Sequence, residues 1–304
     1  MIIVVDDNCE NKRLDLYLSE IYKDVSRSKI QSSIKSGAVK VNGEIKKPSY
    51  ILKEGEKIEF ENLVPEKNIK PLPEKIELEI IWEDENMAVI NKPSVMLTHP
   101  TTVENSGTLV NALLYKYGEE LSDINGEFRR GIVHRLDRNT SGLIMIAKNN
   151  KTHKYLAQKI KDHDFTKKYR AIIKGDYPID EDIIELPISR HKTQPHKMTV
   201  SPDGKPSKTI LKVIERFKEA TYVELTLITG RTHQIRVHLS SKNHPIYNDT
   251  LYGAGVGKVK TDEQVLQSFY LKFAKPFSSQ IIELAIEPDE KIQKVLNYYK
   301  NRRA

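Results

Sequence analysis

Hydrophobic residues near the N-terminus recur at helical spacing and then change to the alternation typical of strands. Two helical segments show this spacing, one over 14–21 and one over 30–34. Ser26 or Ser28 can cap the second of these helices. Alternating apolar residues then surround the turn formers at 42–43. We therefore expect a compact N-terminal unit of two helices followed by short strands.

The rest of the chain shows both patterns. Helical spacing appears over 108–117 and 151–163, and again where Ile235 and Leu239 lie one turn apart. Strand alternation appears over 76–82, 87–90, 143–147, 167–173 and 222–228. The residues that we expect to complete the core near the C-terminus are Phe269, Leu271, Phe273, Phe277 and Leu284.

A proline-rich stretch separates these two parts. Pro65, Pro71 and Pro73 occur among few apolar residues, as in a semi-rigid linker. We predict an N-terminal domain over 1–62, a linker over 63–75 and a larger domain over 76–304.

Composition narrows the class of protein. A chain of 304 residues has room for one sizeable core and a small accessory domain. Cys9 is the only cysteine, which excludes an internal disulfide and a multi-cysteine zinc site and suggests a reducing compartment. The sequence shows no signal-peptide pattern and no membrane-spanning run, so we expect a cytoplasmic protein without membrane contact.

Positive charge is concentrated in two regions. The net charge is +7, and residues 23–53 contain eight Lys or Arg against two acidic residues. Residues 190–245 contain eleven Lys or Arg against four acidic residues. An acidic partner such as nucleic acid is therefore favoured over a neutral one.

A charged segment lies between apolar flanks at 131–148. His134 begins the segment, and Asp137 lies between Arg135 and Arg138. The flanks are strand-like, and Asn139, Ser141 and Gly142 are turn formers. Two neighbouring cations favour an ionised carboxylate and also suit a polyanion. Taken alone, however, the segment fits a surface hairpin whose Asp caps a turn.

Three motifs together resemble the RluA/RluD type of pseudouridine synthases. Residues 134–143 match the signature H-R-L-D-x-x-T-S-G, and K-K-Y-R-A at 167–171 carries a tyrosine 32 residues after the aspartate. G-R-T-H-Q-I-R at 230–236 is similar to the family's third motif. The resemblance implies an α+β catalytic domain with a central, largely antiparallel sheet around an RNA cleft.

The resemblance also implies roles for individual residues. It gives Asp137, Tyr169 and Arg236 as catalytic, with Arg236 pairing both oxygens of Asp137. Arg231 competes for that pairing, but we assign it to phosphate because five helical residues separate the two arginines by about 140°. His233 and His238 lack the spacing of a metal pair. The residues expected to bind the substrate are His134, Arg135, Arg138, Thr140, Ser141, Arg231 and Gln234.

The N-terminal unit resembles the S-four type of RNA-binding domain. The pattern R-L-D-x-x-L, then S-R-S-K-I, then G-x-V-x-V-N-G carries the resemblance. It implies an RNA-binding surface formed by Arg13, Arg27, Ser28, Lys29, Lys35 and Asn42. A solvated helix face would explain the lysines alone. We expect a structured RNA as partner, with large-subunit ribosomal RNA favoured over transfer RNA, no cofactor, no metal and a monomer.

Pseudouridine formation needs one ionised carboxylate and no redox step, because uracil leaves the sugar and returns through carbon 5. Two alternatives remain at this point. A non-catalytic RNA-binding or ribosome-assembly factor would keep the same basic surfaces without needing Asp137. A glycosidase acting on the same bond would usually require a second carboxylate, and none lies near Asp137 in the sequence.

Overall fold

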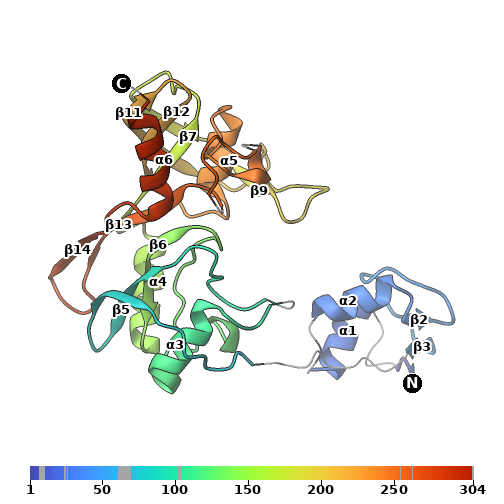
Figure 1. Ribbon diagram of the computed structural model, residues 1–304. Coiled ribbons are helices and arrows are strands. Elements are labelled where there is room, and N and C mark those ends of the chain that lie inside the picture. The colour runs from blue at the N-terminus through green and yellow to red at the C-terminus, as the bar shows by residue number, and fades with distance from the viewer. Residues whose placement is uncertain are drawn as a thin grey trace. The chain divides into compact units, whose positions relative to one another are not determined.

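The structure is a computed structural model that describes residues 1–6, 11–23, 25, 27–60, 70–101, 104–253, 255–261 and 263–302. The chain divides into two compact units, Met1–Ile69 and Lys70–Ala304 (Figure 1). Cys9, the capping candidate Ser26 and residues 63–69 of the predicted linker lie outside the described residues.

The N-terminal unit consists of two helices and a small antiparallel sheet. Its helices are α1 (Leu14–Ile21) and α2 (Arg27–Lys35), and its sheet order is β1 (Ile2–Val4), β3 (Lys57–Phe60), β2 (Val39–Val41). Leu14, Leu18, Ile30 and Ile34 are fully buried in one cluster, as their helical spacing predicted. Ser28 lies inside α2, so the prediction that it caps this helix is wrong.

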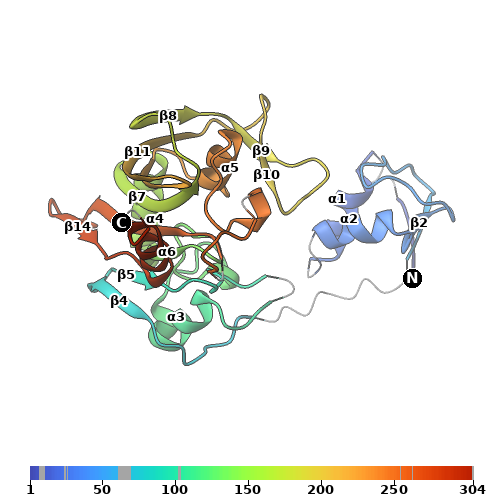
Figure 2. The same cartoon turned by 45° about the horizontal axis from the view of Figure 1, so that its top comes forward.

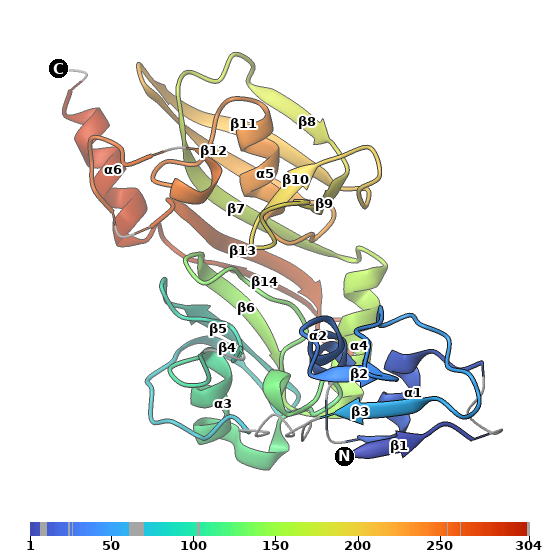
Figure 3. The ribbon, with the colours of Figure 1, turned by 90° about the vertical axis from the view of Figure 1, so that its right-hand side faces the viewer.

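A large mixed sheet forms the centre of the second unit (Figure 3). Its order in the described residues is β4 (Glu79–Glu83), β5 (Met87–Lys92), β6 (Ser141–Ala147), β13 (Leu266–Ala274), β7 (Phe165–Lys174), β12 (Ala220–Leu227), β11 (Lys208–Phe217), β8 (Glu181–Glu185), with β14 (Ile281–Ala285) paired to β13. Its neighbouring strands are antiparallel except β6 and β13, which are parallel. The predicted α+β class with a largely antiparallel sheet is confirmed.

Helices and a separate two-stranded hairpin accompany this sheet. The helices are α3 (Leu109–Tyr117), α4 (Asn150–Lys161), α5 (Gln234–Ser241) and α6 (Glu290–Lys300), with single 3-10 turns η1 (Gly118–Glu120), η2 (Glu127–Arg129) and η3 (Thr250–Tyr252). Thr108 caps α3 through a reciprocal contact with Asn111. The hairpin of β9 (Ile188–Arg190) and β10 (Met198–Val200) lies beside α5 (Figure 2).

The parallel contact between β6 and β13 requires a glycine. Gly142 has a φ of +110°, and a Cβ atom there would lie 2.0 Å from the Ser268 carbonyl oxygen. Gly142 and Ser141 are therefore strand residues, and their prediction as turn formers is wrong. The alternative of a surface hairpin does not hold, since Ile132 makes only an isolated bridge to Ile146 and 134–140 form a loop.

Two further expectations need correction. Residues 70–75 belonged to the predicted linker, but the Leu72 carbonyl accepts a hydrogen bond from Asn111 of α3, and Glu74 accepts one from the Gly107 amide. Phe277 is 49% exposed and does not complete the core, whereas Leu271 and Phe273 are buried. No helix among the described residues is long and apolar enough to cross a membrane.

Candidate active site

Buried hydrogen-bond donors hold the loop that carries Asp137. Lys92 is fully buried, and its Nζ donates to the carbonyls of Pro93, Met96 and Arg138 at 2.7, 2.8 and 3.0 Å. Burial lowers the pKa of this ammonium to about 7. Thr98 Oγ1 also donates to the carbonyl of the residue that precedes Asp137. These contacts fix the backbone of the loop that leads into β6.

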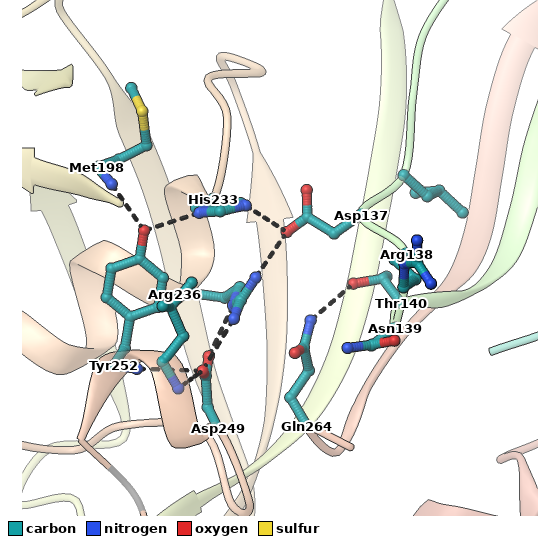
Figure 4. A network of polar contacts seen from close by, with 12 residues as sticks. Asp137, Arg138, Asn139, Thr140, Met198, His233, Arg236, Asp249, Tyr252 and Gln264 are labelled. Carbon is teal, nitrogen blue, oxygen red and sulfur yellow. Dashed lines mark hydrogen bonds and ion pairs between the residues drawn. The ribbon is translucent and has the colours of Figure 1, made fainter. Parts of the chain in front are cut away.

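The Asp137 carboxylate meets Arg236 of α5, which also holds a second acid (Figure 4). Arg236 Nη1 lies 3.4 Å from Asp137 Oδ2. Its Nε and Nη2 donate to both oxygens of Asp249 at 2.7 and 2.9 Å. Burial disfavours the Arg236 cation, but the bonds to Asp249 outweigh burial and raise its pKa. The expected two-oxygen pairing is therefore made with Asp249, and Asp137 receives one longer contact.

A histidine and a tyrosine complete this network. His233 Nε2 lies 3.8 Å from Asp137 Oδ2, and its Nδ1 lies 2.7 Å from the Tyr252 hydroxyl (Figure 4). That hydroxyl already accepts a hydrogen bond from the Met198 amide of β10 at 2.9 Å. We assign the hydroxyl proton to the bond with Nδ1, which leaves an Nε2–H directed at Asp137. Burial lowers the pKa of His233 and favours the neutral ring.

A cavity of about 470 Å³ opens beside Asp137. It is large enough for one nucleotide-sized group. Tyr169 of β7 lines it and is 5% exposed. Burial raises the pKa of the Tyr169 phenol, and the Asp137 charge adds to this effect. The cavity thus joins an aromatic wall to a carboxylate.

The other predicted substrate residues lie in different settings. Arg135 is exposed and lines the cavity together with Arg231, whose Nε donates to the Pro206 carbonyl. Arg138 forms an ion pair with Glu104. Three of the remaining four line the cavity and are largely or fully buried, namely His134, Thr140 and Gln234.

Two of the predicted substrate contacts are used inside the fold. Gln234 accepts from Thr229 and from the Arg231 amide, and its own amide donates to Lys208 and Thr209. Ser141 donates to Asp289, the residue that caps α6. Both side chains therefore orient elements around the cavity.

Comparison with known proteins identifies the class of this site. Residues 86–241 match the RNA pseudouridylate synthase family, and residues 12–58 match the S4 domain. An uncharacterized RNA pseudouridine synthase of Aquifex aeolicus is 38% identical, over 95% of this chain and 94% of its own length. The chain belongs to the RNA pseudouridine synthase family.

Further similarities agree with this family. A protein of Vibrio parahaemolyticus named ribosomal large subunit pseudouridine synthase D is 36% identical, over 95% of this chain and 91% of its own length. The solved structure of human RNA pseudouridylate synthase domain containing 1 is 26% identical with a TM-score of 0.58, and the match covers 69% of this chain and 83% of that one. The resemblance stated from the sequence motifs is confirmed.

The structure adds residues to the pseudouridine synthase site that the motifs alone did not reveal. Asp249 and Tyr252 come from a segment that the sequence marks only as a turn. Asp249 is the second carboxylate that seemed absent, but it is 1% exposed and both of its oxygens are occupied. Lys92 ends a strand-like run, and only its burial among backbone carbonyls reveals its task. The sequence shows Lys92 only as a charged residue after a strand-like run, which does not indicate that it is buried.

The predicted RNA-binding residues of the S4 unit include two that hold the unit together. Arg13 and Arg27 both donate to Asp15, which is fully buried. Asn42 accepts from the Lys57 amide and adopts a φ of +50°, so it shapes the turn after β2. Lys29 and Lys35 lie on α2 with exposed side chains. Half of the Arg27 side chain also remains exposed, which leaves donor surface for a phosphate.

Proposed function

We propose that this pseudouridine synthase isomerises uridine in large-subunit ribosomal RNA and that Asp137 is its catalytic carboxylate. The substrate class is supported by relatives named ribosomal large subunit pseudouridine synthase D, which are 36% and 40% identical in Vibrio parahaemolyticus and Yersinia pestis. The S4 match also favours a structured RNA. Asp137 is supported by its place at the wall of the cavity.

One observation carries the catalytic role. Asp137 Oδ2 faces Arg236 and His233, while Oδ1 has no hydrogen-bond partner among the described residues. The side chain is 18% exposed, and the residue lines the cavity. An oriented carboxylate with one free oxygen can attack the sugar or the base, or assist the departure of uracil.

The reaction breaks the bond between uracil N1 and C1′ and forms a bond from C5 to the same carbon, and the C5 proton then moves to N1. Arg236 would keep Asp137 ionised inside the cavity, because an opposite charge offsets the cost of burial. Tyr169 would form the wall against which the base lies after it leaves its stack. Its phenol would also take part in the proton transfer from C5 to N1, donating its own proton to N1 before it receives the C5 proton.

Arg135 and Arg231 would bind phosphates next to the target nucleotide. Both are cavity-lining guanidinium groups with exposed surface. A guanidinium presents a planar pair of donors that matches phosphate oxygens. These two residues would therefore position the backbone while the cavity holds the base.

The experiment compares wild-type protein with Asp137→Asn on uridine-labelled ribosomal RNA and transfer RNA, and pseudouridine is quantified. Asp203→Asn is the matched control, since Asp203 is exposed and lies outside the cavity. We expect product from wild type and the control on ribosomal RNA, and none from Asp137→Asn. Native, partly assembled ribosomal RNA is included because a naked transcript can lack the required fold.

Other outcomes identify the competing functions. If Asp137→Asn retains wild-type activity, the catalytic assignment fails. Product on transfer RNA alone would replace the proposed substrate class. RNA binding by wild type without any product would favour a binding factor, and release of free uracil would favour a glycosidase.

A further inference from the structure

The cavity contains a lysine to which the reaction scheme gives no task. Lys167 lies two residues before Tyr169 on β7, and Phe165 lies two residues before Lys167. Residues two apart on a strand share a face, and all three line the same cavity. Lys167 is 9% exposed. The strand therefore places an almost fully buried ammonium on the wall that carries the aromatic ring.

This ammonium has no acceptor among the described residues. Its Nζ makes no hydrogen bond and no ion pair there, and it lies 4.7 Å from the centroid of the Phe165 ring. A buried ammonium usually donates to protein acceptors. Lys92 in the same unit does so, because its Nζ donates to three carbonyls. A buried charge without such partners is costly. Lys167 thus lacks acceptors that a ligand in the cavity can supply.

The neighbouring histidine cannot supply one. His134 Nε2 accepts a hydrogen bond from the Met145 amide at 3.0 Å, so this nitrogen carries no proton. Burial and the nearby Lys167 charge hold the pKa of His134 well below its usual value. The neutral ring therefore carries its proton on Nδ1, and it offers Lys167 no lone pair.

Lys167 also lies away from the reacting sugar. Tyr169 pairs with Ser268 of β13, which also pairs with Gly142 at the start of β6, directly after the loop that carries Asp137. Lys167 pairs with Leu271, farther along β13 from that loop. Two residues along a strand span about 7 Å. The order along the wall is therefore Asp137, Tyr169, Lys167. A base that stacks on Tyr169 with its glycosidic bond at Asp137 extends its far edge toward Lys167.

We propose that Lys167 donates a hydrogen bond to O4 of the flipped uracil, an inference that rests on the proposed function. O4 lies across the ring from N1, whereas O2 is next to the glycosidic bond. Lysine is a donor only, so it matches the uracil carbonyl and opposes the cytosine amino group at the same position. Its charge also stabilises the negative charge that the ring gains when N1 leaves the sugar.

The test combines one protein change with one atom change in the substrate. Wild type and Lys167→Met are compared in single-turnover assays on RNA that carries uridine, 4-thiouridine or 2-thiouridine at the target position. Sulfur accepts hydrogen bonds weakly, and methionine keeps the length of the side chain without its charge. Lys168→Met is the matched control, because Lys168 points to the opposite face and pairs with Glu224 at 2.9 Å.

We expect wild type and Lys168→Met to slow about tenfold or more on 4-thiouridine and to change little on 2-thiouridine. Lys167→Met should be about 10- to 100-fold slower on uridine and should not distinguish it from 4-thiouridine. The affinity of each variant for the uridine RNA is measured as well. A variant with a folding defect would lose this affinity.

Two results would overturn this assignment. In the first, wild type converts 4-thiouridine as fast as uridine. This result counts against the assignment without any variant. Alternatively, Lys167→Met could slow on 4-thiouridine by the same factor as wild type, which would mean that another group donates to O4. If wild type makes no pseudouridine in any RNA, the proposed function itself fails and this inference falls with it.

Discussion

Asp249 is the residue whose removal should disturb the site most without touching the cavity. It is 1% exposed and accepts four N–H groups: two from Arg236 and the backbone amides of Leu251 and Tyr252 at 3.2 Å. Asp249→Asn replaces one acceptor oxygen by an NH₂ group, which then faces a donor in either orientation. The Arg236 charge also loses its strongest partner.

The magnitude follows from these contacts. Removing one partner of a buried ion pair costs about 3–5 kcal/mol. Arg236 keeps its 3.4 Å contact with Asp137, so we expect about 3 kcal/mol. For a unit of this size, 1 kcal/mol corresponds to about 2–4 °C, which gives a fall in melting temperature of roughly 6–12 °C.

Tryptophan fluorescence can follow the thermal unfolding of the second unit, which contains Asp249. Trp82 is the only tryptophan, and it lies in β4 of the second unit against Phe273. Asp203→Asn, at an exposed position, should stay within about 0.5 kcal/mol of wild type. A melting temperature for Asp249→Asn within 2 °C of wild type would refute the reasoning, because it would mean that Asp249 does not hold Arg236.

Two further predictions concern the S4 unit and the site. Hydrogen bonds from two arginines and Gln31 outweigh burial and lower the pKa of Asp15 to about 2, so its stabilisation is present above pH 4 and is lost as pH falls toward 2. Hydrogen exchange of α1 amides should show this loss, of roughly 2 kcal/mol, and Asp15→Asn should abolish the pH dependence. Tyr252→Phe removes the donor to His233 and should slow single turnover about fivefold at unchanged RNA affinity. Tyr115→Phe, at a 54% exposed position, should have no effect, and equal rates for both variants would contradict the assigned tautomer.

Local patterns predicted most of the elements because they depend on neighbouring residues. The helical spacing of Leu14 and Leu18, for example, requires no distant partner. Gly142 shows the limit of such reasoning. A glycine among polar residues resembles a turn, and only the backbone of β13, more than a hundred residues later, shows that it belongs to a strand.

The site shows the same limit. The motifs predicted that Arg236 would lie near Asp137, and the structure places these residues together across 99 positions of sequence. The second acid could not be predicted, because Asp249 reaches Arg236 through a loop whose sequence indicates only a turn. Lys167 could have been found, since strand alternation alone puts it on the same face as Tyr169.

The division of Arg236 between two acids explains why the pairing differs from the expected one. If both Asp137 oxygens were bound to the guanidinium, neither would be free to meet a substrate. Asp249 instead takes Nε and Nη2 and fixes the plane of the group, so that only Nη1 faces Asp137. Asp137 thereby gains a nearby positive charge and a direction while one oxygen remains open. For the role proposed for Asp137, this arrangement combines a nearby positive charge with one open oxygen, whereas a two-oxygen salt bridge to Arg236 would occupy both oxygens.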